Sequence, residues 1–200
     1  MKTTGRITMM KKYGTYAVAL VSAAAILLFH TGEASAQNLA VKTNALMWGA
    51  LTPNLGVELV TGERTSVDIS AFGHKNPYGI TSKVIGLQPE FRFWLSGRPM
   101  VREYIGIGAL LVSYDTTLRD RVFDGDAAGL GITGGYVLPL GKRWNIEFSG
   151  SFGLVYYQQK KYFKGDNYDD YFVNDMPKAN SRGYELLPID LGITFTYIIK

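Results

Sequence analysis

The chain has 200 residues, 46% of them hydrophobic, with 23 glycines and no cysteine. Without cysteine it can form neither a disulfide nor a lipid anchor at a signal junction, so packing and backbone pairing must provide its stability. Four of the 21 basic residues and one of the 17 acidic residues precede Gln37, which leaves 17 basic and 16 acidic residues. This near balance, without a basic stripe that carries aromatic residues, argues against nucleic-acid binding.

Residues 1–36 have the layout of a cleavable secretory signal. A basic start is followed by an apolar run from Ala17 to Phe29 and by the small-residue site Ala34-Ser35-Ala36. The apolar run is shorter than the roughly 20 residues that a membrane-spanning helix needs. We therefore expect cleavage near Ala36–Gln37 and one domain over residues 37–200, with a retained N-terminal anchor as the alternative.

From Gln37 onward, apolar and polar residues alternate with a period of two, and no segment outside the signal shows a helical period. The pattern predicts eight strands, some of them longer than the five or six residues of typical soluble strands and closer to the ~9–11 of a tilted membrane strand. The fifth strand is apolar on both faces over part of its length, which leaves its register open. The predicted strands are roughly 38–48, 54–61, 65–72, 83–95, 103–114, 127–138, 144–157 and 189–200, the last preceded by 184–188.

The connections between these strands alternate between short turns and mostly longer polar loops. Tight turns are expected at 62–64, 96–101 and 139–143, and loops at 49–53, 74–82, 115–126 and 158–183. In an antiparallel meander all the turns then lie at one end and all the loops at the other, as in outer-membrane barrels. No apolar run after the signal is long enough for a spanning helix, so a membrane location requires a closed sheet. The predicted fold is all-β, an eight-stranded antiparallel up-and-down transmembrane β-barrel.

If the apolar face of each strand points outward, the opposite face fills a narrow lumen with polar side chains. Two cations cannot balance five carboxylates there, so we expect Arg102 or Arg143 to contribute, or some carboxyl groups to lie near a wet rim. Gly129, Gly131 and Gly135 share this inward face, which explains the string GLGITG better than a dinucleotide site does. The expected lumen network is Lys42, Glu58, Asp68, Glu90, Arg92, Glu147 and Asp190.

Aromatic residues gather near the expected strand ends, as in the girdles of membrane barrels. The alternative is that they cap a soluble core. The set includes Trp48, Phe72, Trp94, Tyr104, Tyr114, Tyr136, Trp144, Tyr156, Tyr157, Tyr184 and Tyr197.

His74 is the only histidine after residue 36, so a multi-histidine metal site is excluded and no cofactor is expected. Some small outer-membrane barrels are lipid A acylation or deacylation enzymes with a histidine and a serine at the outer rim. His74 near Ser70 or Ser82 could supply that pair, although catalysis also needs hydrogen-bond reach and an orienting third group. We expect a non-enzymatic protein, with this enzyme as the first alternative.

The last predicted loop, 158–183, is the best candidate for contacting a partner, because it exposes aromatic side chains among polar ones. Its candidate contact residues are Tyr162, Phe163, Tyr168, Tyr171 and Phe172.

The final strand, IDLGITFTYIIK, fits the pattern polar-x-Gly-x-x-aromatic-x-aromatic through Asp190, Gly192, Phe195 and Tyr197. This resembles the C-terminal signal by which the barrel assembly machinery recognises outer-membrane proteins, although residues 198–200 follow the last aromatic. We expect Asp190 to point into the lumen. The residues expected to point outward are Ile189, Leu191, Ile193 and Phe195.

The segments NLAVKTNALMWGALTPNLGVEL and LQPEFRFWL resemble an uncharacterised Bacteroidota family of small outer-membrane barrels, over nearly the whole chain after residue 36. The resemblance implies a barrel similar in size to the OmpA transmembrane domain. Some members occur beside fimbria-type genes, which implies a surface-assembly role.

The expected function is structural or interactive, in the outer membrane, with contacts through the outer loops. Its expected partners are outer-membrane lipids, the assembly machinery during biogenesis and a surface or fimbria-type protein. The second alternative is a soluble periplasmic barrel of lipocalin type, whose apolar face would line a ligand pocket.

Overall fold

The computed structural model describes residues 39–166 and 181–199. The chain divides into two units, Met1–Ala36 and Gln37–Lys200, and all described residues belong to the second. The predicted signal and the partner-contact residues Tyr168, Tyr171 and Phe172 lie outside the described residues. The elements are β1 (Leu39–Asn44), α2 (Ala45–Gly49), β2 (Asn54–Val60), β3 (Thr65–Lys75), η1 (Pro77–Gly79), β4 (Ser82–Trp94), β5 (Arg102–Leu118), β6 (Arg121–Pro139), β7 (Trp144–Phe163) and β8 (Ser181–Ile198).

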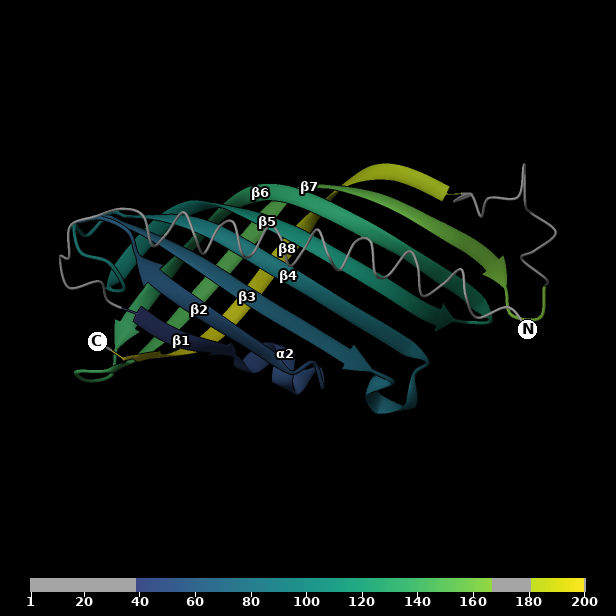
Figure 1. The fold of residues 1–200 in the computed structure, drawn as a ribbon, viewed down its shortest axis with the longest axis horizontal. Coiled ribbons are helices and arrows are strands. Elements are labelled where there is room, and N and C mark those ends of the chain that lie inside the picture. The colour runs from purple at the N-terminus through teal and green to yellow at the C-terminus, as the bar shows by residue number, and fades with distance from the viewer. Residues whose placement is uncertain (1–38, 167–180, 200) are drawn as a thin grey trace. The chain divides into compact units, whose positions relative to one another are not determined.

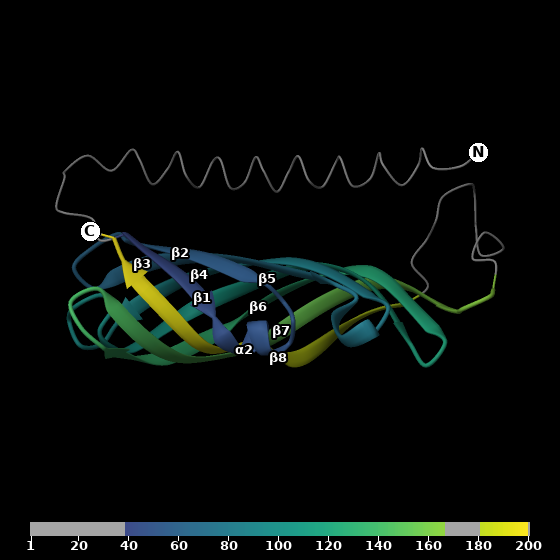
Figure 2. The same cartoon turned by 90° about the horizontal axis from the view of Figure 1, so that it is seen from below.

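The eight strands form one closed antiparallel sheet in chain order, and β8 returns to pair with β1 (Figures 1 and 2). This confirms the predicted all-β, up-and-down barrel. Among the described residues, no helix has the length and hydropathy to cross a membrane. The turns after β2, β4 and β6 and the end of β8 lie at one end of the barrel, which we call the turn end, and the connections after β1, β3 and β5 lie toward the other, which we call the outer end.

The barrel wall is much taller on one side than on the other. β1 and β2 have 6 and 7 residues, whereas β7 has 20. The prediction of a loop over 115–126 is wrong, because β5 and β6 continue as a ladder to a two-residue turn in which Arg119 and Asp120 have φ angles of 48° and 62°. Such turns match the twist of paired strands. β7 likewise extends to Phe163, so α2 lies far short of the outer end (Figure 1).

The first strand is shorter than predicted, and a helical turn follows it. The Asn44 side chain accepts a hydrogen bond from the Leu46 amide at 3.0 Å and so caps α2. An asparagine in this position satisfies one of the amides that a helix start leaves free. The expectation of no helical segment outside residues 1–36 is therefore wrong at α2 and at the short η1.

A β-bulge in β8 reverses the expected direction of Ile189. Ser151 pairs with Asp190 but the next residue of β7, Phe152, pairs with Pro188, which leaves Ile189 as the extra residue. Ile189 turns inward and is only 7% exposed, whereas Leu191 is 68% exposed and points outward as predicted. A bulge places two residues against one and shifts the alternation of faces, which a strict period of two cannot anticipate.

The structure also settles the register of the fifth strand. Tyr104, Gly106 and Gly108 face the lumen, and Ile105 and Ile107 face outward. Glycine is required at 106, because a Cβ there would lie 2.3 Å from the Phe91 carbonyl oxygen.

An apolar plug closes the lumen at the turn end. Two of its members, Trp94 and Tyr104, were expected in an outward girdle, and that prediction is wrong because both follow the inward parity of their strands. Their ring centroids lie 5.0 Å apart. The plug consists of Ala40, Trp94, Met100, Tyr104 and Val137.

Candidate functional site

The lumen next to the plug holds a dense cluster of ion pairs centred on two cations. Lys42 Nζ lies 2.9 Å from Glu58 Oε2, 2.9 Å from Asp68 Oδ2 and 2.7 Å from Glu147 Oε2. These four side chains come from β1, β2, β3 and β7, so one ammonium group ties together strands from opposite sides of the barrel.

Arg92 on β4 is the second cation. Its Nε lies 2.7 Å from Glu90 Oε1, its Nη1 lies 3.2 Å from Glu58 Oε2 and its Nη2 lies 2.9 Å from Glu147 Oε1. The guanidinium also lies over the Tyr104 ring, 4.4 Å from its centroid. A planar guanidinium can bind several carboxylates at once, which suits it to a buried hub.

Hydroxyl groups join this cluster to the plug. Ser66 Oγ donates to Glu58 Oε1 at 2.6 Å, and Trp94 Nε1 donates to Ser66 Oγ at 2.8 Å. On the other side, Tyr104 OH donates to Glu147 Oε1 at 2.8 Å. Ser66 and Tyr104 are cluster members that the sequence pattern did not predict, although Ser66 shares the inward parity of Asp68, which indicates the first of them.

All seven predicted network residues face the lumen, but neither Arg102 nor Arg143 adds positive charge to the network. Arg102 is exposed and pairs with Glu103 at 3.5 Å, and Arg143 donates to the Tyr197 hydroxyl. The structure instead shares Lys42 and Arg92 among four carboxylates. The fifth, Asp190, accepts a hydrogen bond from Ser149 Oγ at 3.3 Å.

A small cavity of about 40 Å³ lies beyond the ion pairs on the side of the outer loops. A space this size holds water-sized groups only, since one water needs roughly 10–15 Å³ by this measure. Among the residues that the structure describes, no three histidine or acidic side chains are arranged to hold a metal ion. The polar lining of the cavity includes Asn44, Asp68, Ser70, Gln88, Glu90, Ser149, Ser151, Asp190 and Thr194.

Farther toward the outer end, a chain of hydrogen bonds runs along the inner wall of the barrel, from the segment before β2 across β3 and β4 to β5. Thr52 Oγ1 lies 2.9 Å from His74 Nδ1, His74 Nε2 lies 3.1 Å from Ser82 Oγ, and Ser82 Oγ lies 2.8 Å from Thr116 Oγ1. Of the two serines considered for His74, Ser82 is the neighbour, because Ser70 donates instead to Asp68. Ser82 is buried and points into the barrel. The group that orients His74 from its other ring nitrogen is the Thr52 hydroxyl rather than a carboxylate.

The outer face of the sheet carries large apolar side chains. Ile132 is 75% exposed, and two aromatic pairs, Trp144 with Tyr197 and Tyr156 with Tyr184, lie along β7 and β8 with ring centroids 4.9 and 5.0 Å apart. Other members of this outward set are Leu55, Ile85, Phe91, Ile107, Leu130, Phe148, Phe152, Leu154 and Leu191.

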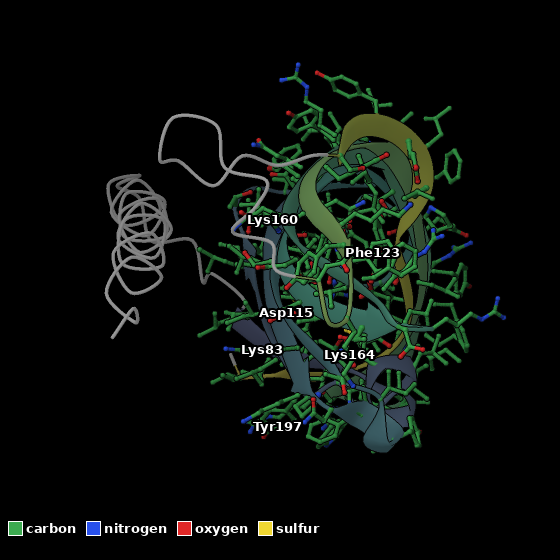
Figure 3. All side chains as sticks on the ribbon, turned by 90° about the vertical axis from the view of Figure 1, so that its right-hand side faces the viewer. Lys83, Asp115, Phe123, Lys160, Lys164 and Tyr197 are labelled. Carbon is green, nitrogen blue, oxygen red and sulfur yellow. The ribbon has the colours of Figure 1, made fainter. Side chains whose placement is uncertain are left out.

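The candidate partner residues Tyr162 and Phe163 belong to β7 rather than to a loop. Phe163 is exposed, with the Arg121 guanidinium 4.9 Å from its ring centroid. Figure 3 faces the outer end, where the labelled Phe123 and Lys160 come from the extended parts of β6 and β7.

The residues of the proposed C-terminal assembly signal alternate as the sequence predicts. Asp190 and Gly192 face the lumen, and Phe195 and Tyr197 lie on the opposite face. A Cβ at Gly192 would lie 2.4 Å from Ser149 Oγ, so a larger side chain would displace that serine.

These features define a class of protein: a closed eight-stranded β-barrel with an ion-paired, plugged lumen and an apolar outer surface. A family model described as "Protein of unknown function (DUF3575)" matches residues 22–199, and the chain belongs to this family. This confirms that the chain belongs to an uncharacterised family, as the resemblance seen in the sequence implied. Neither the curated proteins nor the solved structures give a match to the chain.

Proposed function

We propose that this protein is an outer-membrane β-barrel that does not catalyse a reaction and that binds other envelope components through its outer end. The observation that carries the proposal is the reversed polarity of the barrel. Lys42, Glu58, Arg92 and Glu147 are buried inside, while Ile132 and its apolar neighbours are exposed outside. A soluble barrel buries its apolar face, whereas a membrane barrel turns it to lipid.

The dimensions of the apolar surface support a membrane location. On β7 it runs from Trp144 to Tyr156, and each of these residues is in an aromatic pair with β8. At ~3.3 Å per residue and a tilt of ~45°, that span covers about 28 Å along the barrel axis. Membrane barrels have an apolar band of ~25 Å between two aromatic girdles.

The interior supports a role other than solute transport. The plug around Trp94 and Met100 and the shared ion pairs of Lys42 and Arg92 fill the turn end of the lumen. A barrel of eight strands has room for side chains but not for an aqueous channel. The polar lumen also disfavours the lipocalin-type alternative, which needs an apolar interior.

Membrane fractionation tests the location. The protein expressed with its own N-terminal segment should be recovered with the outer-membrane fraction and should need detergent for release. A folded barrel should also migrate faster in unheated than in heated gel samples. Recovery in the soluble fraction without detergent would overturn the proposal.

The tall outer wall supports the interaction role. β5 to β8 extend well beyond α2 (Figure 1). Their tips carry the exposed Phe163 and the half-buried Phe123, whose ring centroid lies 5.7 Å from Lys161 Nζ. By the resemblance seen in the sequence, a surface or fimbria-type protein is the expected partner.

A pulldown from envelope extracts tests this role, with the intact protein compared with a variant that lacks Lys160–Ser181. The matched control replaces Tyr184 and Leu186, outward residues of the apolar band, by alanine. Loss of one specific partner only from the deletion variant is expected. The same captured proteins with both variants would contradict the interaction role of this segment.

We also expect Phe195 and Tyr197 to act during assembly. Their outward side chains on the last strand fit a surface that assembly machinery reads before the barrel closes. Replacing both by serine should lower the amount of folded protein in the membrane several-fold, measured by heat-dependent gel migration and blotting. Replacing the outward Leu130 and Ile132 by serine is the control, and normal levels of the first double variant would overturn the assembly role.

A further inference from the structure

Asp190 stands apart from the other lumen carboxylates. Glu58, Asp68, Glu90 and Glu147 all contact Lys42 or Arg92, but the ion pairs of the described residues include none with Asp190. The residues lining the cavity include four carboxylates and two cations: Asp68, Glu90, Glu147, Asp190, Lys42 and Arg92. A carboxylate held away from bulk water without a direct cationic partner is unfavourable unless it takes up a proton or a positive group joins it.

A second, independent feature lies beside it. Ser151 is the cross-strand neighbour of Asp190, is 7% exposed and lines the same cavity, yet its Oγ has no hydrogen-bond partner. Asp68 Oδ2 also lacks a hydrogen bond of good geometry, although it lies 2.9 Å from Lys42 Nζ. Buried polar atoms are nearly always satisfied by protein, water or ligand, so the free Ser151 Oγ can accept a hydrogen bond from a group that enters the cavity.

The space between these groups is kept open by a glycine. A Cβ on Gly108 would lie 3.7 Å from Ser151 Oγ and 3.9 Å from Glu90 Cγ, so the absent side chain leaves room between Ser151 and Glu90. Lys42, at the edge of the same cavity, shows what such oxygens accept, because its ammonium group lies among three carboxylates at 2.7–2.9 Å.

We propose that this cavity binds a primary ammonium group, with Asp190 as its counter-charge and Ser151 Oγ as a hydrogen-bond acceptor. An ammonium has three donors and no acceptor, which matches a lining of carboxylate and hydroxyl oxygens. The cavity of about 40 Å³ admits the charged end of a short amine but not a bulky headgroup. The site depends on the lumen alone, so it holds whether or not the barrel lies in a membrane.

The test uses the detergent-solubilised protein and ethylammonium chloride as the probe, followed by amide chemical shifts. Saturable shifts near Gly108, Ser151 and Asp190 are expected with an affinity of roughly millimolar, the ceiling for a ligand of three non-hydrogen atoms. Ethanol, which has the same size without the charge, and sodium chloride at equal concentration serve as controls. Equal saturable shifts with sodium chloride or ethanol would overturn the assignment to an ammonium group.

Two variants locate the site. Asp190→Asn should weaken ethylammonium binding at least about tenfold, and Ser151→Ala about threefold. Asp126→Asn is the matched control, because Asp126 is exposed near the outer end and pairs with Ser113, and it should bind as the parent does. Unchanged affinity in Asp190→Asn, or no saturable binding in the parent, would overturn the proposal. Heat-dependent gel migration verifies folding of each variant, and Ser151→Ala decides the matter if Asp190→Asn does not fold.

Discussion

The two ends of the lumen hold their polar groups in different ways. At the turn end, Lys42 and Arg92 each bind several carboxylates, and an apolar plug seals them from below. Toward the outer end, the Thr52–His74–Ser82–Thr116 chain joins hydroxyl groups and one imidazole by hydrogen bonds, and Ser151 Oγ has no hydrogen-bond partner. The ion-pair cluster stabilises the barrel as a unit, because the loss of one charged group leaves several buried partners without a counter-charge. In the hydrogen-bonded chain, the loss of one side chain affects only its direct neighbours.

The strongest test of this contrast removes one hub cation. Arg92→Leu removes the ion pairs that Arg92 makes with Glu58, Glu90 and Glu147 and leaves these buried carboxylates with Lys42 as the remaining cation of the cluster. Loss of one partner from such a site costs about 3 to 5 kcal/mol. Urea unfolding in detergent, followed by tryptophan fluorescence, should show that loss. Arg102→Leu, at an exposed arginine, should change stability by less than about 1 kcal/mol, and an equal loss in both would contradict the contrast.

A glycine substitution tests the close packing of the turn end. Gly106→Ala should destabilise the barrel by about 1 to 3 kcal/mol, because the new Cβ would collide with the rigid Phe91 carbonyl. Gly134→Ala is the matched control, since its nearest neighbour would be at an ordinary 3.5 Å. The same unfolding midpoint for both variants would show that β4 and β5 can move apart freely.

The hydrogen-bonded chain near the outer end should tolerate a comparable deletion better. His74→Leu removes two side-chain hydrogen bonds, at Thr52 and at Ser82, and each contributes about 0.5 to 1.5 kcal/mol. The expected loss in urea unfolding is smaller than that of Arg92→Leu. A larger loss of unfolding free energy in His74→Leu than in Arg92→Leu would contradict the contrast, because the hydrogen-bonded chain would then stabilise the barrel more than the ion pairs do.

The smallest effect is expected at the far tip of the wall. Asp120 adopts φ 62° in the two-residue turn between β5 and β6, a conformation that glycine adopts more easily. Asp120→Gly should therefore change the free energy of unfolding by no more than about 1 kcal/mol, in the stabilising direction. A large destabilisation would mean that the Asp120 side chain holds the hairpin.

The sequence predicted the parity of most strands and the lumen residues, because Glu58, Asp68, Arg92 and Glu147 sit on the polar face of regular alternation. It could not predict Ile189, whose direction depends on a bulge against β7 rather than on its own strand. Trp94 and Tyr104 were misplaced because an aromatic near a strand end fits a girdle and a plug equally well. The sharing of two cations among four carboxylates is a three-dimensional result, since these residues lie on five different strands.

The short first strand has a consequence for how the barrel closes. β1 meets β8 only from Ala40 to Asn44, whereas β7 pairs with β8 from Trp144 to Gln159. This seam is therefore the shorter of the two ladders that β8 makes. Amide hydrogens along it should exchange with water sooner than those between β6 and β7, and in folding it should form later than the ladder between β7 and β8.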